Sequence, residues 1–336
     1  MIKEQLLHLD RLRWVQRVWG PRCLTVLAYH RIADPHQADF RTYRANVSAT
    51  PANFAAQLDF LHKHFQPVSL AEVLAWLEEG RSLPRYPALV TFDDGYADNW
   101  SAAMPALRAH QTPAHIFLAT AYIGQNRPFF WDLAAYCFHH TPLPEAELPG
   151  QGRVSWPDPQ SKQSALENWL AWLKTLPDAA KWVALEQLPD QLHVTIPDNA
   201  FAGLHLTWDQ VRQMAREGIS FGAHTHTHPI MTRISLPQAR HEANLSRARL
   251  QEELGQSVTT FAFPNGQATD FNTRLQDMLH QCGFRAAFTL LPGPNRARQA
   301  RRAPFAIRRV AIHYRDALPR FAGKVMGLTR LINLPR

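Results

Sequence analysis

The stretch Ala88-Leu-Val-Thr-Phe-Asp-Asp-Gly95 decides the fold of this chain, because it joins a buried strand to a pair of acidic residues. Residues 88–92 form a short, largely apolar run of the kind that fills a strand buried on both faces. Asp93 and Asp94 follow, and two adjacent carboxylates repel each other and lose solvation unless a cation, a proton or hydrogen-bond donors face them. Strand alternation points the two side chains in different directions, so one could hold a metal while the other faces a reacting group.

Short strands alternate with helices on both sides of this stretch. The predicted strands cover residues 24–29, 88–92, 114–119, 219–223, 258–263, 285–290 and 307–312. The predicted helices cover residues 51–65, 69–80, 98–109, 208–217, 235–254 and 271–281, and three of them open with capping boxes at Ser69/Glu72, Thr207/Gln210 and Ser235/Gln238. This alternation predicts an α/β fold with a parallel sheet, and about seven strands favour a closed barrel over an open sheet. Ligands then gather at the C-terminal ends of the strands.

Residues 125–205 interrupt this alternation. The segment is rich in proline and contains one helix-like run, 164–176. We expect one long insertion placed over the strand ends. It serves either as a lid or substrate wall, or as surface decoration without a role in binding.

The charge of the chain is concentrated in one region. The 336 residues are 46% hydrophobic and 19% charged, which is typical of a packed, enzyme-sized domain. The net charge is +8, but residues 285–336 contain 12 Lys and Arg and one acid, Asp316, so this segment carries +11 and the remainder −3. An acidic glycan or an anionic membrane surface is therefore expected to meet the C-terminal segment. Nucleic acid is not expected, because the segment contains no nucleic-acid-binding motif.

The ends of the chain suggest a location. Residues 1–22 have the pattern of an amphipathic helix, which packs on the domain or lies on a membrane, and we predict a basic helix over residues 316–336. The first thirty residues do not resemble a secretion signal, and no apolar run is long enough to cross a membrane. We therefore predict a cytoplasmic protein and hypothesise peripheral docking on the inner membrane face.

A second polar cluster follows the strand predicted at 219–223. In the run Phe221-Gly-Ala-His-Thr-His-Thr-His-Pro229, three histidines occur within five residues. Imidazole is the commonest neutral ligand of zinc-class metals, and two histidines with one carboxylate and open positions form a hydrolytic site. His224 and His228 with one aspartate would supply three protein ligands.

These residues resemble the polysaccharide deacetylases with a NodB homology domain, carbohydrate esterase family 4. Thr91-Phe-Asp-Asp-Gly95 is similar to the first family motif, and His224-Thr-His-Thr-His228-Pro229 is similar to the second. The resemblance implies a distorted (β/α) barrel over residues 23–315. It also implies a divalent metal, with Zn²⁺ as first choice, held by Asp94, His224 and His228, and Asp93 as general base. His226 is expected to lie outside the metal shell.

The third family motif is only partly present, at Phe261-Ala-Phe-Pro-Asn-Gly266. Ala262 replaces the arginine that orients the base in the family, so another basic residue is needed, with Arg285 and Arg309 as candidates. Asn265 replaces a tyrosine, but its backbone N–H could still donate to a tetrahedral oxyanion. The fourth motif, an Asp-Trp pair, has no counterpart near residues 285–300.

Two histidines are candidates for the general acid. Val310-Ala-Ile-His313 matches the spacing of the fifth family motif, whose histidine protonates the leaving group, but His313 could equally be a structural residue. His30, at the end of the first strand, could supply the proton or a hydrogen bond to a metal-site carboxylate. Trp131 could stack on a sugar ring or anchor the insertion.

The resemblance predicts metal-assisted removal of N-acetyl groups from a sugar in a polysaccharide or lipid-linked glycan, with acetate and a free amino sugar as products. Two alternatives remain at this stage. The same scaffold could hydrolyse a cyclic amide or imide, or the missing arginine and Asp-Trp pair could mark a glycan-binding module without activity.

Overall fold

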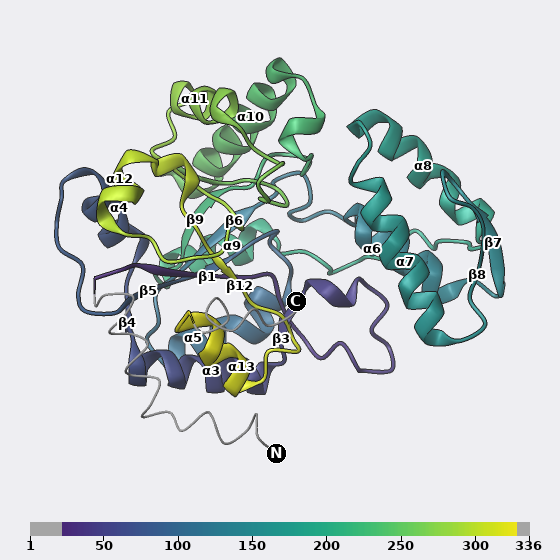
Figure 1. Cartoon of the computed structure of the whole chain (residues 1–336), viewed down its shortest axis with the longest axis horizontal. Helices are drawn as coiled ribbons and strands as arrows, with labels where there is room; N and C mark the ends of the chain where they lie inside the picture. Colours follow the sequence, from purple (N-terminus) through teal and green to yellow (C-terminus); the bar gives the residue numbers. More distant parts are fainter. Residues whose placement is uncertain (1–21, 328–336) are drawn as a thin grey trace.

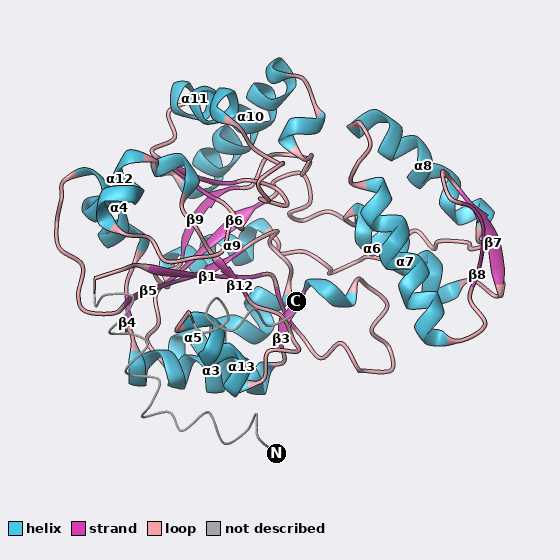
Figure 2. Cartoon of the chain, viewed as in Figure 1, coloured by secondary structure: helices cyan, strands magenta, loops and turns pink. Residues whose placement is uncertain are grey.

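The computed structural model describes residues 22–327, and a parallel sheet lies at its centre (Figures 1 and 2). Its strands are β1 (Thr25–Tyr29), β4 (Gln66–Pro67), β5 (Pro87–Phe92), β6 (Ala114–Leu118), β9 (Ser220–Ala223), β10 (Thr260–Ala262), β11 (Ala286–Phe288) and β12 (Val310–Ala311). The strand order is β11-β10-β9-β6-β5-β1-β12, with β4 beside β5. Every pairing among them is parallel.

Residues 307–312 close this sheet. On one side, the Ile307 N–H donates to the Ala287 carbonyl at 2.9 Å, and the Thr289 N–H donates to the Ile307 carbonyl at 2.8 Å. On the other side, the Ile312 N–H donates to the Ala28 carbonyl of β1 at 3.0 Å. Backbone hydrogen bonding therefore continues from β11 back to β1. The prediction of a distorted (β/α) barrel with about seven parallel strands is confirmed.

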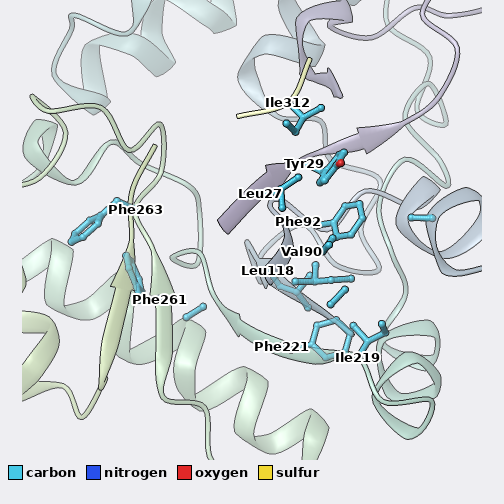
Figure 3. Close-up of a cluster of buried hydrophobic side chains, with 14 of the residues drawn as sticks. Leu27, Tyr29, Val90, Phe92, Leu118, Ile219, Phe221, Phe261, Phe263 and Ile312 are labelled. Carbon is cyan, nitrogen blue, oxygen red and sulfur yellow. The ribbon is translucent and has the colours of Figure 1, made fainter. Parts of the chain in front are cut away.

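Both faces of the strands are buried, as the apolar run in β5 predicts. Leu89 packs in one apolar cluster with β1, β6 and α4 (Leu70–Glu78), and the neighbouring Val90 packs in another with the outer helices. Figure 3 shows side chains of the second cluster, among them Leu27, Val90, Leu118 and Phe221, which follow one another across β1, β5, β6 and β9. Because successive residues face opposite sides, Thr91 and Asp93 continue the row of Leu89.

Helices cover the outside of the barrel. They are α3 (Pro51–His64), α4, α5 (Met104–Ala109), α9 (Trp208–Arg216), α10 (Leu236–Leu254), α11 (Thr273–Gln281), α12 (Ala297–Arg302) and α13 (Leu318–Val325), with short turns η1 (Arg44–Asn46), η3 (Met231–Arg233) and η4 (Pro304–Ala306). The three predicted capping boxes are present at the starts of α4, α9 and α10. Among residues 22–327, no helix combines the length and apolar character needed to cross a bilayer.

One predicted helix differs from the regular form. The helix expected over residues 98–109 begins as a π-helix, η2 (Asn99–Ala103), before α5. Pro105 explains the change, because its ring clashes with the carbonyl four residues earlier in an α-helix. The Met104 N–H bonds to the Asn99 carbonyl instead, which widens the turn ahead of the proline.

The interruption between β6 and β9 forms a separate lobe, which Figure 1 shows in teal on the right. It contains α6 (Phe130–His140), the hairpin β7 (Glu145–Leu148) and β8 (Gly152–Ser155), α7 (Pro159–Leu173) and α8 (Asp178–Gln191). These elements surround their own apolar cluster, which joins the barrel at Tyr96, Ala119 and Tyr122. The helix expected at 164–176 starts earlier, at Pro159, because Asp158 caps it.

The predicted terminal segments are covered only in part. The helix predicted for residues 1–22 lies outside the described residues except for residue 22. Of the helix predicted for 316–336, α13 lies within the described part, and residues 328–336 lie outside it. A short pair of strands, β2 (Arg31–Ile32) and β3 (Val47–Ala49), flanks the end of β1 and was not predicted.

Candidate active site

Three buried side chains converge at the C-terminal ends of β5 and β9. Asp94 follows β5, and His224 and His228 follow β9. Their ligand atoms lie within 4.8 Å of one another. Asp94 Oδ1 is 3.5 Å from His224 Nε2 and 3.4 Å from His228 Nε2, and the two Nε2 atoms are 3.1 Å apart. The structure therefore brings together the three residues that the family resemblance assigns to the metal.

The chemistry of this donor set fits a divalent cation. Both carboxylate oxygens of Asp94 are buried and have no hydrogen-bond partner among residues 22–327, and a buried carboxylate needs a partner. Burial alone would raise the pKa of Asp94, but the two imidazoles lower it below its usual range, so the carboxylate is ionised at neutral pH. His224 Nδ1 donates to the Ala262 carbonyl at 2.8 Å, which leaves Nε2 as a free donor atom for a metal. Two imidazole nitrogens and a carboxylate are typical zinc ligands.

The backbone around the triad is unusual. Asp94, Thr225 and His228 have φ values of 76°, 64° and 60°, in the left-handed region that non-glycine residues rarely adopt. Such conformations cost about 1 to 3 kcal/mol each and gather at functional sites. The Thr225 hydroxyl supports the turn by accepting from the His228 N–H at 3.0 Å.

Asp93 faces the interior of the barrel, where Arg309 holds it. The Arg309 guanidinium donates to both carboxylate oxygens at 2.7 Å and is itself fixed by the Thr289 carbonyl at 3.0 Å. Burial would raise the pKa of Asp93, but the charge and hydrogen bonds of Arg309 outweigh it and the pKa is lowered. Of the two arginines considered as substitutes for the one missing at Ala262, Arg309 contacts Asp93, whereas Arg285 pairs with Glu78.

The two candidate acids lie in different surroundings. His30 Nε2 is 4.0 Å from Asp93 Oδ2, and the side chain is 21% exposed. The His313 N–H donates to Asp316 at 2.9 Å, and the His313 ring accepts from the Arg315 N–H at 3.2 Å. Burial and nearby cations, despite Asp316, lower the pKa of His313 to about 4. The structure thus places His30 beside Asp93 and His313 in the turn before α13.

Asn265 lies at the strand end next to β9, with a φ of 62°. Within residues 22–327 its backbone N–H makes no hydrogen bond. The Asn265 side chain donates to Asp270 and accepts from Lys174 of the lobe at 3.4 Å. Burial lowers the pKa of Lys174. Lys174 is a contact that the sequence pattern did not indicate.

Trp131 packs against His228 of the Asp94-His224-His228 triad. It is 6% exposed, and its ring lies 4.9 Å from the His228 ring at 79°. Its indole N–H donates to the Tyr96 hydroxyl at 2.7 Å. This placement makes Trp131 a buried wall of the site that connects the lobe to His228. His226 lies outside the triad, with Nδ1 2.9 Å from the Thr120 hydroxyl.

Two acidic residues near the site were not identified from the sequence as part of it. Asp132 accepts from the Tyr96 hydroxyl at 2.6 Å and from the Tyr43 N–H at 2.9 Å, and burial raises its pKa to about 6. Glu242 of α10 accepts from the loop between His224 and His228. Neither belongs to a spacing pattern, so only the fold reveals them.

Comparisons with known proteins place this chain in a family. The model of the family "Polysaccharide deacetylase" matches residues 81–287. An Escherichia coli (strain K12) protein, poly-beta-1,6-N-acetyl-D-glucosamine N-deacetylase, is 31% identical over 100 residues, which are 30% of this chain and only 14% of that protein.

Two solved structures share the fold. The Streptococcus pyogenes deacetylase PplD, in complex with acetate, superposes with a TM-score of 0.61 at 17% identity, covering 91% of this chain and 99% of that one. IcaB from Ammonifex degensii has a TM-score of 0.57 at 19% identity, covering 91% and 97%. Because the family model matches more than half of the chain, this protein belongs to the polysaccharide deacetylase family of hydrolases.

Proposed function

We propose that this protein removes N-acetyl groups from an N-acetylated sugar of a glycan in a metal-dependent hydrolysis. The observation that carries the proposal is the convergence of Asp94, His224 and His228 beside Asp93, which Arg309 holds in place. A divalent metal held by the triad would polarise the acetyl carbonyl and lower the pKa of a water molecule. Zn²⁺ is the first metal to test, because its preferred ligands match the triad.

Asp93 is the general base of this proposal. Its lowered pKa leaves it ionised at neutral pH, so it can accept the proton of the attacking water. The two hydrogen bonds from Arg309 fix the orientation of the carboxylate. Accurate orientation matters because small displacements of a catalytic group reduce the rate strongly.

His30 is the proton donor that the geometry favours. Cleavage of an amide requires a proton on the leaving nitrogen. His30 lies 4.0 Å from the carboxylate of the base and is partly exposed, so it can reach a bound sugar. His313 stays the alternative donor from the motif spacing. The unpartnered backbone N–H of Asn265 is suited to donate to the oxyanion of the acetyl group.

The substrate is proposed as a polymer containing N-acetylglucosamine. Poly-β-1,6-N-acetylglucosamine is the first polymer to test, because the name of the E. coli relative gives it as that protein's substrate. Lipid-linked glycans stay part of the proposal. A cytoplasmic location is a separate part of the proposal, and docking on an anionic membrane is another. The docking is supported by exposed arginines of the C-terminal segment, namely Arg296, Arg298, Arg301, Arg302, Arg315 and Arg320.

The decisive experiment measures acetate release from oligomers of β-1,6- and β-1,4-linked N-acetylglucosamine, with and without a chelator. We expect release that the chelator abolishes and Zn²⁺ restores, and no release by Asp94→Ala or His228→Ala. Asp277→Ala changes an exposed carboxylate on α11 and serves as the control with unchanged activity. Full release by either triad variant would overturn the proposal. Activity only on a panel of cyclic amides, or glycan binding without acetate release, would favour the two alternatives.

A further inference from the structure

Glu242 lies on α10 beneath the loop that joins the two histidines of the triad. Its Oε2 accepts from the backbone N–H groups of His226 and Thr227, each at 2.7 Å. Its Oε1 accepts from the Thr227 hydroxyl, also at 2.7 Å. All three distances are typical of strong bonds to an ionised acceptor.

On its barrel side the loop is held through its carbonyls: the Ala121 N–H donates to the His226 carbonyl at 2.9 Å, and the Tyr122 hydroxyl donates to the Thr227 carbonyl at 3.2 Å. Glu242 instead binds the N–H groups of the same two residues. His224 is anchored to the barrel, because its N–H donates to the Leu118 carbonyl at 3.0 Å and its ring donates to the Ala262 carbonyl. At the other end of the loop is His228. The backbone between the two histidines is left-handed at Thr225, and it is left-handed again at His228 itself. The carboxylate of Glu242 binds the two residues between these positions. It therefore limits where the loop can carry His228 relative to His224.

We propose that Glu242 is a positioning residue that sets the geometry of the Asp94-His224-His228 triad through the loop. Glu242 touches neither substrate nor metal; it acts by holding the backbone of residues 226 and 227. The inference rests on the proposed function, since it concerns the same metal site. It adds a residue that lies outside the sequence motifs, on helix α10.

The substitutions separate this role from a general effect on folding. Glu242→Ala removes all three hydrogen bonds. Glu242→Gln keeps an oxygen that can accept from both backbone N–H groups, and its amide can donate to the Thr227 hydroxyl. Thr227→Val removes only the hydroxyl contact. Glu252→Ala, on the same helix, removes an exposed glutamate that pairs with Arg249 and is the matched control.

The test measures Zn²⁺ affinity of the full chain, freed of metal by a chelator, in competition with a chromophoric chelator. Mutation of a residue that hydrogen-bonds to metal ligands typically lowers the metal affinity by about 10- to 100-fold. We expect a loss in this range for Glu242→Ala, less than about tenfold for Glu242→Gln and Thr227→Val, and no change for Glu252→Ala. The visible spectrum of the Co²⁺-loaded chain should change for Glu242→Ala, because the spectrum reports the arrangement of the ligands.

The outcomes distinguish this inference from the proposed function. If Glu242→Ala folds, binds Zn²⁺ as tightly as the wild type and keeps its Co²⁺ spectrum, the inference is wrong and the proposed function is unaffected. If Glu242→Ala does not fold, the other two variants decide. Zn²⁺ affinities of Glu242→Gln and Thr227→Val equal to that of wild type overturn the inference, and a graded loss of affinity supports it. If wild type binds Zn²⁺ with this dependence on Glu242 but releases no acetate, only the proposed function fails. A wild type that binds neither metal overturns both.

Discussion

Asp93 and Asp94 are adjacent, yet the backbone between them separates their surroundings. Asp93 continues the inward row of β5 and meets Arg309, whereas Asp94, with a φ of 76°, faces His224 and His228. Each carboxylate thus has its own cationic or donor partners, which offsets the repulsion between two buried charges. The division allows one to act as base while the other holds a metal.

Arg309 can be tested as the residue that orients the base. We predict that Arg309→Lys lowers kcat for acetate release by about 100-fold, because a single ammonium cannot hold both oxygens of Asp93. KM and Zn²⁺ affinity should stay unchanged, since Arg309 contacts neither the triad nor the expected sugar site. Arg308→Lys, at the half-buried neighbouring position, is the control. An unchanged kcat would show that Asp93 does not need the paired hydrogen bonds.

The general acid can be identified from the leaving group. An amine must be protonated as it leaves, whereas the phenolate of an umbelliferyl acetate leaves without help. We predict that His30→Ala reduces amide cleavage by at least about 100-fold and ester cleavage much less, while His313→Ala changes both only slightly. Steady-state rates on an N-acetylglucosamine oligomer and on the ester provide the comparison. The reverse pattern would assign the acid to His313.

At the scale of elements, local signals predicted most of the barrel. The capping pairs at Ser69, Thr207 and Ser235 mark real helix starts, because the cap is formed within four residues. The lobe was predicted less well: α6, α8 and the hairpin of β7 and β8 were not identified, because prolines and short runs obscure their periodicity. The π-helix η2 before α5 was not predicted, because it depends on the single residue Pro105.

The residues of the site also differ in how far local sequence signals could identify them. Asp94, His224 and His228 could be identified because each follows a strand in a dense polar motif. Arg309 could be named only as one of two candidates, because its contact with Asp93 requires the closure of the barrel by residues 307–312. Glu242 binds the N–H groups of His226 and Thr227 from 16 and 15 residues further along the chain, a separation that no short motif indicates.

Asp132 links α6 of the lobe to the barrel and should make stability depend on pH. Its folded pKa of about 6 exceeds the ordinary 3.8, so the folded protein keeps a proton that the unfolded chain has released between these values. The stabilising contribution is fully present below pH 3.8 and is lost as the pH rises through 6. It amounts to about 3 kcal/mol, since each pKa unit corresponds to about 1.4 kcal/mol.

We predict that the free energy of unfolding of wild type minus that of Asp132→Asn falls by about 2.4 kcal/mol from pH 4 to pH 7. Urea unfolding of the chelator-treated proteins measures this difference. Titratable groups that both proteins contain contribute equally to the two free energies, so their contributions cancel. Asp277→Asn, at an exposed carboxylate, should show a constant difference from wild type. A constant difference for Asp132→Asn as well would mean that Asp132 is ionised throughout.

At the scale of the whole molecule, the site exists only when the barrel is closed. His30 comes from the end of β1, Asp94 from β5, His224 from β9 and Arg309 from the segment before β12. The lobe adds Trp131, which packs on His228. The ligands are therefore far apart in the unfolded chain, and a metal that binds the triad binds the folded state and stabilises the whole protein.

This coupling gives a prediction for metal removal. At a free Zn²⁺ concentration 100 times its Kd, binding adds about 2.7 kcal/mol to the free energy of unfolding. For a chain of 336 residues this corresponds to a rise in Tm of about 4 °C over the chelator-treated protein. Asp94→Asn should show no rise, because the variant lacks the one anionic ligand, and Asp277→Asn should show the full rise. Thermal unfolding followed by circular dichroism, with chelator and with Zn²⁺, makes the comparison. An equal rise in Asp94→Asn would place the stabilising ion at a site other than the triad.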